Sequence, residues 1–133
     1  MLSETDVING VCAKLESLGY KTRQRFKTTE SGINIVAVKD GAMPIELYVQ
    51  AKGDTSSKNA NLQINVADAF YKAVAILCLK AERDQVMPAI AFANNSEYQK
   101  HVRVIQPMLD QLGIVVFWVK GKNNVEVVSP WEI

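Results

Sequence analysis

The sequence predicts an α/β domain in which a mixed sheet is flanked by helices. Segments with helical periodicity alternate with segments of strand periodicity along the chain. A hairpin signal, Asp40-Gly41, lies between two of the strand-like segments. Two short apolar runs, at residues 88–93 and 114–119, are typical of buried strands. With 133 residues the chain can bury one continuous core, so we expect residues 1–133 to form a single domain.

Composition limits the classes of protein to consider. Apolar residues make up 48% of the chain and charged residues 22%, which is ordinary for a globular domain. The net charge is +1, so contact with nucleic acid would depend on a local cluster of cations. No apolar run reaches the roughly 18 residues of a membrane span, and we expect a cytoplasmic protein with no membrane partner. Cys12 and Cys78 lie in predicted helices, where we expect buried free thiols.

The first predicted element is a helix over residues 4–18, in which apolar side chains recur at helical spacing. Ser3, with Asp6 three residues later, is typical of a helix start. Gly19 is typical of a helix end.

A strand with a basic face is predicted over residues 20–27, where side chains alternate with a period of two. The cations of that face are Lys21, Arg23, Arg25 and Lys27. Cations spaced along a strand can follow a phosphate backbone, and Lys58 would add to such a surface. They can equally keep an edge strand solvated, so both interpretations stay open.

A β-hairpin is predicted next, with strands at residues 33–39 and 45–52. The connecting loop contains Asp40-Gly41 and Pro44. A helix over residues 63–82 follows, and its apolar face should pack across the sheet.

The remainder of the chain is predicted to add a strand, a helix and two strands: residues 88–93, 96–112, 114–119 and 125–128. Ser96 is the expected helix cap and Gly113 the expected helix end. Pro107 predicts a kink or a break in that helix. The full predicted order is αβββαβαββ.

The predicted hairpin resembles the metal-site hairpin of the PD-(D/E)XK nuclease superfamily. Its first strand carries Asn34 where that superfamily usually has Asp, and its second strand reads Gln50-Ala51-Lys52. The QxK form is similar to the variant found in Mrr-like restriction endonucleases. The element order matches as well, and the resemblance implies a restriction-endonuclease-like αβββαβ core with a C-terminal αββ extension.

This resemblance implies a site and a cofactor. Asn34, Gln50 and Lys52 would form the catalytic set, with Asn34 and Gln50 as ligands of a magnesium ion that activates water. Because both ligands are neutral amides, Glu46 on the same strand and Glu4 in the first helix are candidates for the missing carboxylate. Alternatives stay open for both, since Glu4 can favour the helix dipole and Glu46 can be a solvated strand residue.

Three functions remain open at the level of the sequence. The first is nuclease-related nucleic-acid processing by magnesium-dependent phosphodiester hydrolysis, with DNA as the expected partner. The second is a catalytically inactive nuclease-fold domain that binds nucleic acid or a protein partner. The third is a homo-oligomer or partner complex formed through the apolar residues 114–118. The small size of the chain also favours a homodimer.

Overall fold

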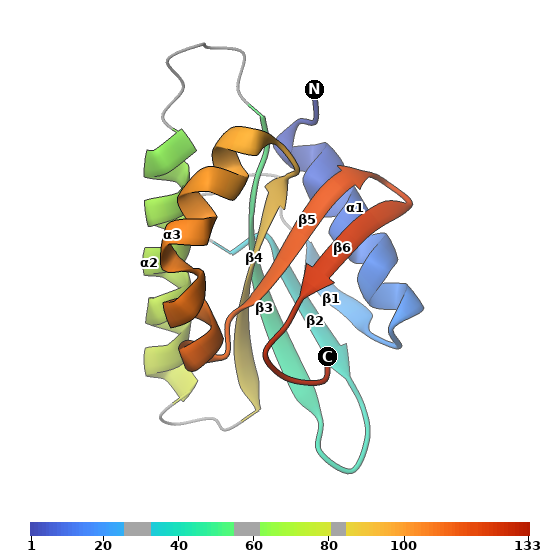
Figure 1. Ribbon diagram of the computed structural model, residues 1–133. Coiled ribbons are helices and arrows are strands. Elements are labelled where there is room, and N and C mark those ends of the chain that lie inside the picture. Colours follow the sequence, from blue (N-terminus) through green and yellow to red (C-terminus); the bar gives the residue numbers. More distant parts are fainter. Residues whose placement is uncertain (26–32, 55–61, 81–84) are drawn as a thin grey trace.

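The computed structural model describes residues 1–25, 33–54, 62–80 and 85–133, and its elements follow the predicted order (Figure 1). The helices and strands are α1 (Glu4–Ser17), β1 (Lys21–Arg25), β2 (Ile35–Lys39), β3 (Ile45–Lys52), α2 (Leu62–Lys80), β4 (Val86–Ala93), α3 (Ser96–Leu112), β5 (Val115–Gly121) and β6 (Asn124–Val128).

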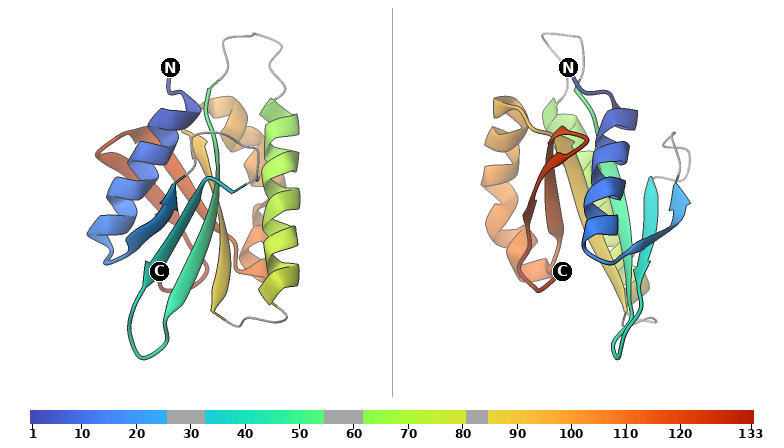
Figure 2. Two further views of the ribbon diagram at one scale, coloured as in Figure 1. Left: turned by 180° about the vertical axis from the view of Figure 1, so that it is seen from behind. Right: turned by 90° about the vertical axis from the view of Figure 1, so that its right-hand side faces the viewer.

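All six strands form one sheet in the order β1-β2-β3-β4-β5-β6. The pairs β1·β2, β2·β3 and β5·β6 are antiparallel, whereas β3·β4 and β4·β5 are parallel. The predicted mixed sheet is therefore confirmed. Helix α1 covers one face, and α2 and α3 lie side by side on the other (Figure 2).

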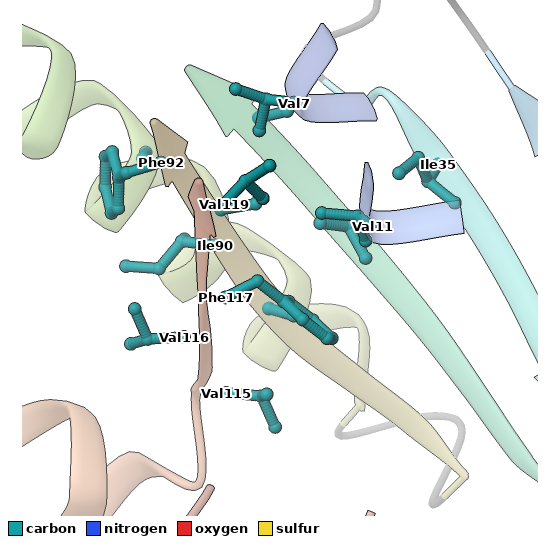
Figure 3. Close-up of a cluster of buried hydrophobic side chains, with 14 of the residues drawn as sticks. Val7, Val11, Ile35, Ile90, Phe92, Val115, Val116, Phe117 and Val119 are labelled. Carbon is teal, nitrogen blue, oxygen red and sulfur yellow. The ribbon is translucent and has the colours of Figure 1, made fainter. Parts of the chain in front are cut away.

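The core lies on both sides of β4 and β5. Val7 and Val11 of α1 approach Phe117 and Val119 on one face of the sheet (Figure 3). The continuous apolar strand β5 is buried because both of its faces are covered, as its sequence predicts. Every residue from 114 to 118 is at most 8% exposed, so the hypothesis that this segment forms an interface is wrong.

Strand β1 differs from its prediction. The register shifts between Thr22 and Gln24, which pair with consecutive residues of β2, so Arg23 is an extra residue in a β-bulge. The bulge interrupts the alternation on which the predicted basic face depends. Lys27 and the side chain of Arg25 lie outside the described part of the chain.

The cap of helix α3 lies one residue before its predicted position. Asn95, not Ser96, is the cap residue, and its side chain accepts a 2.8 Å hydrogen bond from the Tyr98 backbone N–H. The helix continues past Pro107 to Leu112, so the proline does not break it. Arg103, four positions before the proline, is exposed, and water can replace the bond that proline cannot make there.

The two cysteines have different surroundings. Cys12 is buried on α1, as predicted, whereas Cys78 is exposed on α2. The prediction for Cys78 is wrong because the buried face of α2 is set by Val66, Ala69 and Ala73, and Cys78 lies on the opposite side of the helix at 100° per residue. Across the described residues, no helix is long and apolar enough to cross a membrane.

The end of β3 touches the start of α1 at Gly53. A Cβ atom at this position would lie 2.5 Å from the Ser3 carbonyl carbon and 2.9 Å from the Glu4 Cα atom, closer than any real Cβ contact. These neighbours are backbone atoms, which cannot turn away as the end of a long side chain can. Only glycine therefore allows the two segments to meet.

We expect Gly53→Ala to lower the free energy of unfolding by about 1–3 kcal/mol, the usual cost of an overpacked site. Gly41→Ala is the matched control, because a Cβ atom at Gly41 meets nothing within 4 Å. Urea unfolding measures both variants. Equal stability of the two variants would contradict the close packing at Gly53.

Candidate functional site

The hairpin of β2 and β3 sets two amide side chains next to each other in the interior. Asn34 lies just before β2, and its backbone N–H donates a 3.0 Å hydrogen bond to the Val49 carbonyl. Ile35 is registered against Val49, so continuing the antiparallel register sets Asn34 beside Gln50. Asn34 is 0% exposed and Gln50 is 1% exposed.

The Asn34 side chain takes part in the backbone structure of the hairpin. Its Oδ1 atom accepts a 2.7 Å hydrogen bond from the Ala51 N–H. This bond satisfies a buried backbone donor beyond the end of the β2·β3 ladder, and an unsatisfied donor there would be costly. The amide thus has a structural role at the position where the nuclease superfamily usually has a metal-binding carboxylate.

The Gln50 side chain differs from that of Asn34 in its hydrogen bonding. Both its Oε1 and its Nε2 atoms are buried, and neither has a hydrogen-bond partner among the described residues. A buried amide without partners costs stability, because water bonds are lost and nothing replaces them. Among the described residues, nothing therefore fills the hydrogen-bonding capacity of the buried Gln50 amide.

Lys52 forms an ion pair with helix α2. Its Nζ lies 2.6 Å from Asp68 Oδ2, and the side chain of Lys52 is only 11% exposed. Lys72 Nζ lies 2.9 Å from the same oxygen. Desolvation by burial raises the pKa of Asp68, but the hydrogen bonds and charges of Lys52 and Lys72 outweigh it, so the pKa of Asp68 lies below its usual value.

Glu4 joins this cluster from the first turn of α1. Burial raises the pKa of Glu4, while the positive charges of Lys52 and Lys72 act in the opposite direction. The close contact between Gly53 and the Glu4 backbone brings this carboxylate to the same end of β3 as Lys52. The structure therefore places Glu4 at the same end of β3 as Lys52, and its part in a site stays a prediction.

Glu46 does not belong to this group. Its Oε1 atom lies 3.3 Å from Arg23 Nη1 and accepts a 3.0 Å hydrogen bond from the Tyr48 hydroxyl. It lies near the start of β3, and six residues of strand separate it from Lys52 by about 20 Å. The prediction that Glu46 supplies a carboxylate to the site is wrong, because equal strand parity does not bring residues close together.

The structure describes only some of the residues that are predicted to contact nucleic acid. Lys21 is exposed and the Arg23 side chain is 60% exposed, both on the edge strand β1. Lys27, Lys58 and the side chain of Arg25 lie outside the described residues. Their role in binding stays a prediction.

Two site residues, Asp68 and Lys72, are absent from the sequence-based set. Their spacing of four along a helix is typical of an ion pair, and that pattern is visible in the sequence. Nothing in the sequence, however, shows that Lys52 reaches the same carboxylate from β3, because this contact depends on how α2 packs across the sheet.

A similar fold is found among solved structures. The chain resembles an XisH family protein. That crystal structure, of a protein from Nostoc punctiforme PCC 73102, superposes with a TM-score of 0.57 at 16% sequence identity, over 91% of this chain and 97% of the other. Neither a protein-family model nor a curated protein matches the sequence. The likeness to the XisH family protein confirms a restriction-endonuclease-like fold with its αβββαβ core and C-terminal αββ extension.

The donor atoms of the site do not fit a magnesium ion. Magnesium favours anionic oxygen ligands in octahedral geometry, whereas Asn34 and Gln50 offer neutral amide oxygens and Asn34 Oδ1 already accepts from Ala51. The carboxylate of Asp68 is engaged by two lysines. Within the part of the chain that the structure describes, no group of three or more His, Cys, Asp or Glu residues could hold a metal ion.

We expect Gln50→Leu to raise the free energy of unfolding by about 1–3 kcal/mol. The reason is that leucine removes the buried, unpartnered amide at similar volume. Gln99→Leu is the control, because the Gln99 amide donates to Asn94 Oδ1 and its removal should destabilise the fold. Denaturant unfolding compares the two, and a loss of stability in Gln50→Leu would show that the amide has a partner.

Asp68→Asn should lower stability at neutral pH by about 1 kcal/mol, as expected for a partly exposed ion pair. Because the pKa of Asp68 is lowered in the folded state, its stabilising effect is complete above the unfolded pKa of about 3.9. The effect is lost as pH falls through the folded value. Urea unfolding between pH 7 and pH 2 should therefore show the two proteins converging in acid, and a constant difference would contradict the ion pair.

Proposed function

We propose that this chain is a nuclease-fold domain that binds nucleic acid without hydrolysing it. The observation that carries the proposal is that two motif side chains are engaged within the protein. Asn34 accepts from the Ala51 N–H at 2.7 Å, and Lys52 is paired with Asp68 at 2.6 Å. A lysine held in an ion pair and an amide held in a backbone bond are poorly placed to activate water.

Nucleic acid is the proposed ligand because of the fold and the exposed cations. Lys21 and Arg23 stand on the edge strand β1, where a phosphate backbone can approach without displacing the core. Arg23 lies 3.3 Å from Glu46 and is 60% exposed, so solvent weakens that pair and the guanidinium can exchange its partner for a phosphate. Binding through such contacts is electrostatic and depends on salt.

Binding is tested by fluorescence anisotropy with labelled duplex DNA, single-stranded DNA and RNA over a series of salt concentrations. Replacing Lys21 and Arg23 together by alanine should weaken binding and reduce the slope of log K against log salt by roughly 2 on duplex DNA. The matched control replaces Lys100 and Arg103, two exposed cations of α3, and should leave the slope unchanged. Absence of binding to all three probes would refute the proposal.

Hydrolysis is tested on the same probes and on supercoiled plasmid with magnesium or manganese. The unmodified chain should bind without cleaving. Cleavage that disappears in Lys52→Ala would overturn the proposal and establish the nuclease interpretation instead. Cleavage only after Asn34→Asp and Gln50→Glu would support it, because the scaffold would then lack only the carboxylates.

A further inference from the structure

Two lysines share one carboxylate oxygen between β3 and α2. Lys52 Nζ lies 2.6 Å from Asp68 Oδ2, and Lys72 Nζ lies 2.9 Å from the same atom. Each ammonium has three N–H donors, and among the described residues the carboxylate of Asp68 is the one acceptor that engages them. Two positive charges therefore lie close together, and both keep donors that Asp68 does not use.

The position between the two ammonium groups suits a phosphate. Lys52 and Lys72 both bind the same oxygen of Asp68. A phosphodiester carries one negative charge on two non-bridging oxygens, so it can accept hydrogen bonds from both ammonium groups at once. Lysine is a common ligand of phosphate groups in proteins. The carboxylate of Asp68 thus lies where a phosphate would bind the same two cations.

The charge of Glu4 determines whether a phosphate joins Asp68 or replaces it. Burial raises the pKa of Glu4, and the positive charges of Lys52 and Lys72 oppose that rise, so Glu4 belongs to the same electrostatic cluster. Two lysines and two carboxylates carry no net charge. A phosphate added to all four would bring a negative charge that no cation of the cluster balances. Exchange of Asp68 for a phosphate keeps the balance.

The exchange can take place from solvent. The Asp68 side chain is 36% exposed and that of Lys72 is 25% exposed, so a ligand can approach and the carboxylate can rotate into water. An ion pair of this exposure contributes about 1 kcal/mol or less. Burial acts to raise the pKa of Asp68, but the two lysines outweigh it and hold the pKa below its usual value. Asp68 is therefore negatively charged at neutral pH.

We propose that Lys52 and Lys72 form a site for one backbone phosphate of nucleic acid, and that Asp68 occupies this site in the free protein. Asp68 then acts as an internal competitor that lowers the affinity for nucleic acid. The inference rests on the proposed function, because it assigns a phosphate of the same ligand to a second place on the molecule, apart from Lys21 and Arg23 on β1.

Fluorescence anisotropy with labelled duplex DNA tests the competition. Asp68→Asn should lower the dissociation constant by about fivefold, because it removes the competing charge and keeps the size of the side chain. Asp110→Asn makes the same change of charge at an exposed position near the end of α3 and should change the constant by less than about twofold. Adding Lys72→Ala to Asp68→Asn should remove most of the gain. Equal effects of Asp68→Asn and Asp110→Asn would overturn the proposal.

Thermal unfolding with inorganic phosphate tests the anion site without nucleic acid. Phosphate in place of chloride at constant ionic strength should raise the midpoint of Asp68→Asn by about 2–4 °C more than that of Asp110→Asn, which measures the general effect of phosphate. Lys72→Ala should abolish the difference. Circular dichroism follows the unfolding and checks that each variant folds.

The two experiments separate this inference from the proposed function. Stabilisation of Asp68→Asn by phosphate, with no binding of any nucleic-acid probe, would refute the proposed function and support the anion site. Nucleic-acid binding by the unmodified chain, with no specific stabilisation of Asp68→Asn by phosphate, would overturn the anion site and leave the proposed function standing.

Discussion

The helical layers on the two faces of the sheet are joined where the end of β3 meets the first residues of the chain. The Leu2 backbone donates to Asp54 Oδ2 at 2.9 Å, and its carbonyl accepts from the Asp54 N–H at 2.7 Å. Asp54 Oδ1 also accepts from the Asn95 amide at 2.5 Å, and the Tyr98 hydroxyl donates to the Gly53 carbonyl at 2.7 Å. One short segment after β3 is thus bonded both to the segment that leads into α1 and to the start of α3, although these helices lie on opposite faces of the sheet (Figure 2).

The candidate site is built directly on this junction. Lys52 precedes Gly53 in the chain, and Glu4 follows the cap residue of α1. The relative positions of the ammonium and the carboxylate are therefore set by backbone packing, not by flexible side chains. Helix α2 is bonded to the same junction, because the Asn65 amide donates to the Tyr98 hydroxyl at 3.0 Å. Asp68 follows Asn65 by about one turn of α2, so this bond helps to position Asp68 in the cluster. Stability and site geometry are coupled here, since the same bonds support both.

Features that are set by residues close together in the chain could be predicted from the sequence. Features that are set by contacts between distant residues could not. The hairpin, the helices and the buried strand β5 follow from periodicity and turn residues within short windows, and all are confirmed. The features that were missed depend on packing. The bulge at Arg23 and the outward position of Cys78 reflect how β1 and α2 meet the rest of the fold. The Lys52–Asp68 pair joins residues 16 apart in the chain, and no local pattern specifies it.

Gln50 is the motif residue that bears on whether the chain has kept a functional site or only the fold. Asn34 and Lys52 both stabilise the fold, so their presence would be explained by structure alone. Gln50 has no such explanation, because its amide is buried and makes no hydrogen bond to any described residue. When a sequence keeps a residue that lowers the stability of the fold, the usual reason is function. The amide would be favourable if a ligand or a neighbouring group supplied the missing bonds, so Gln50 is the motif residue whose presence the described contacts leave unexplained.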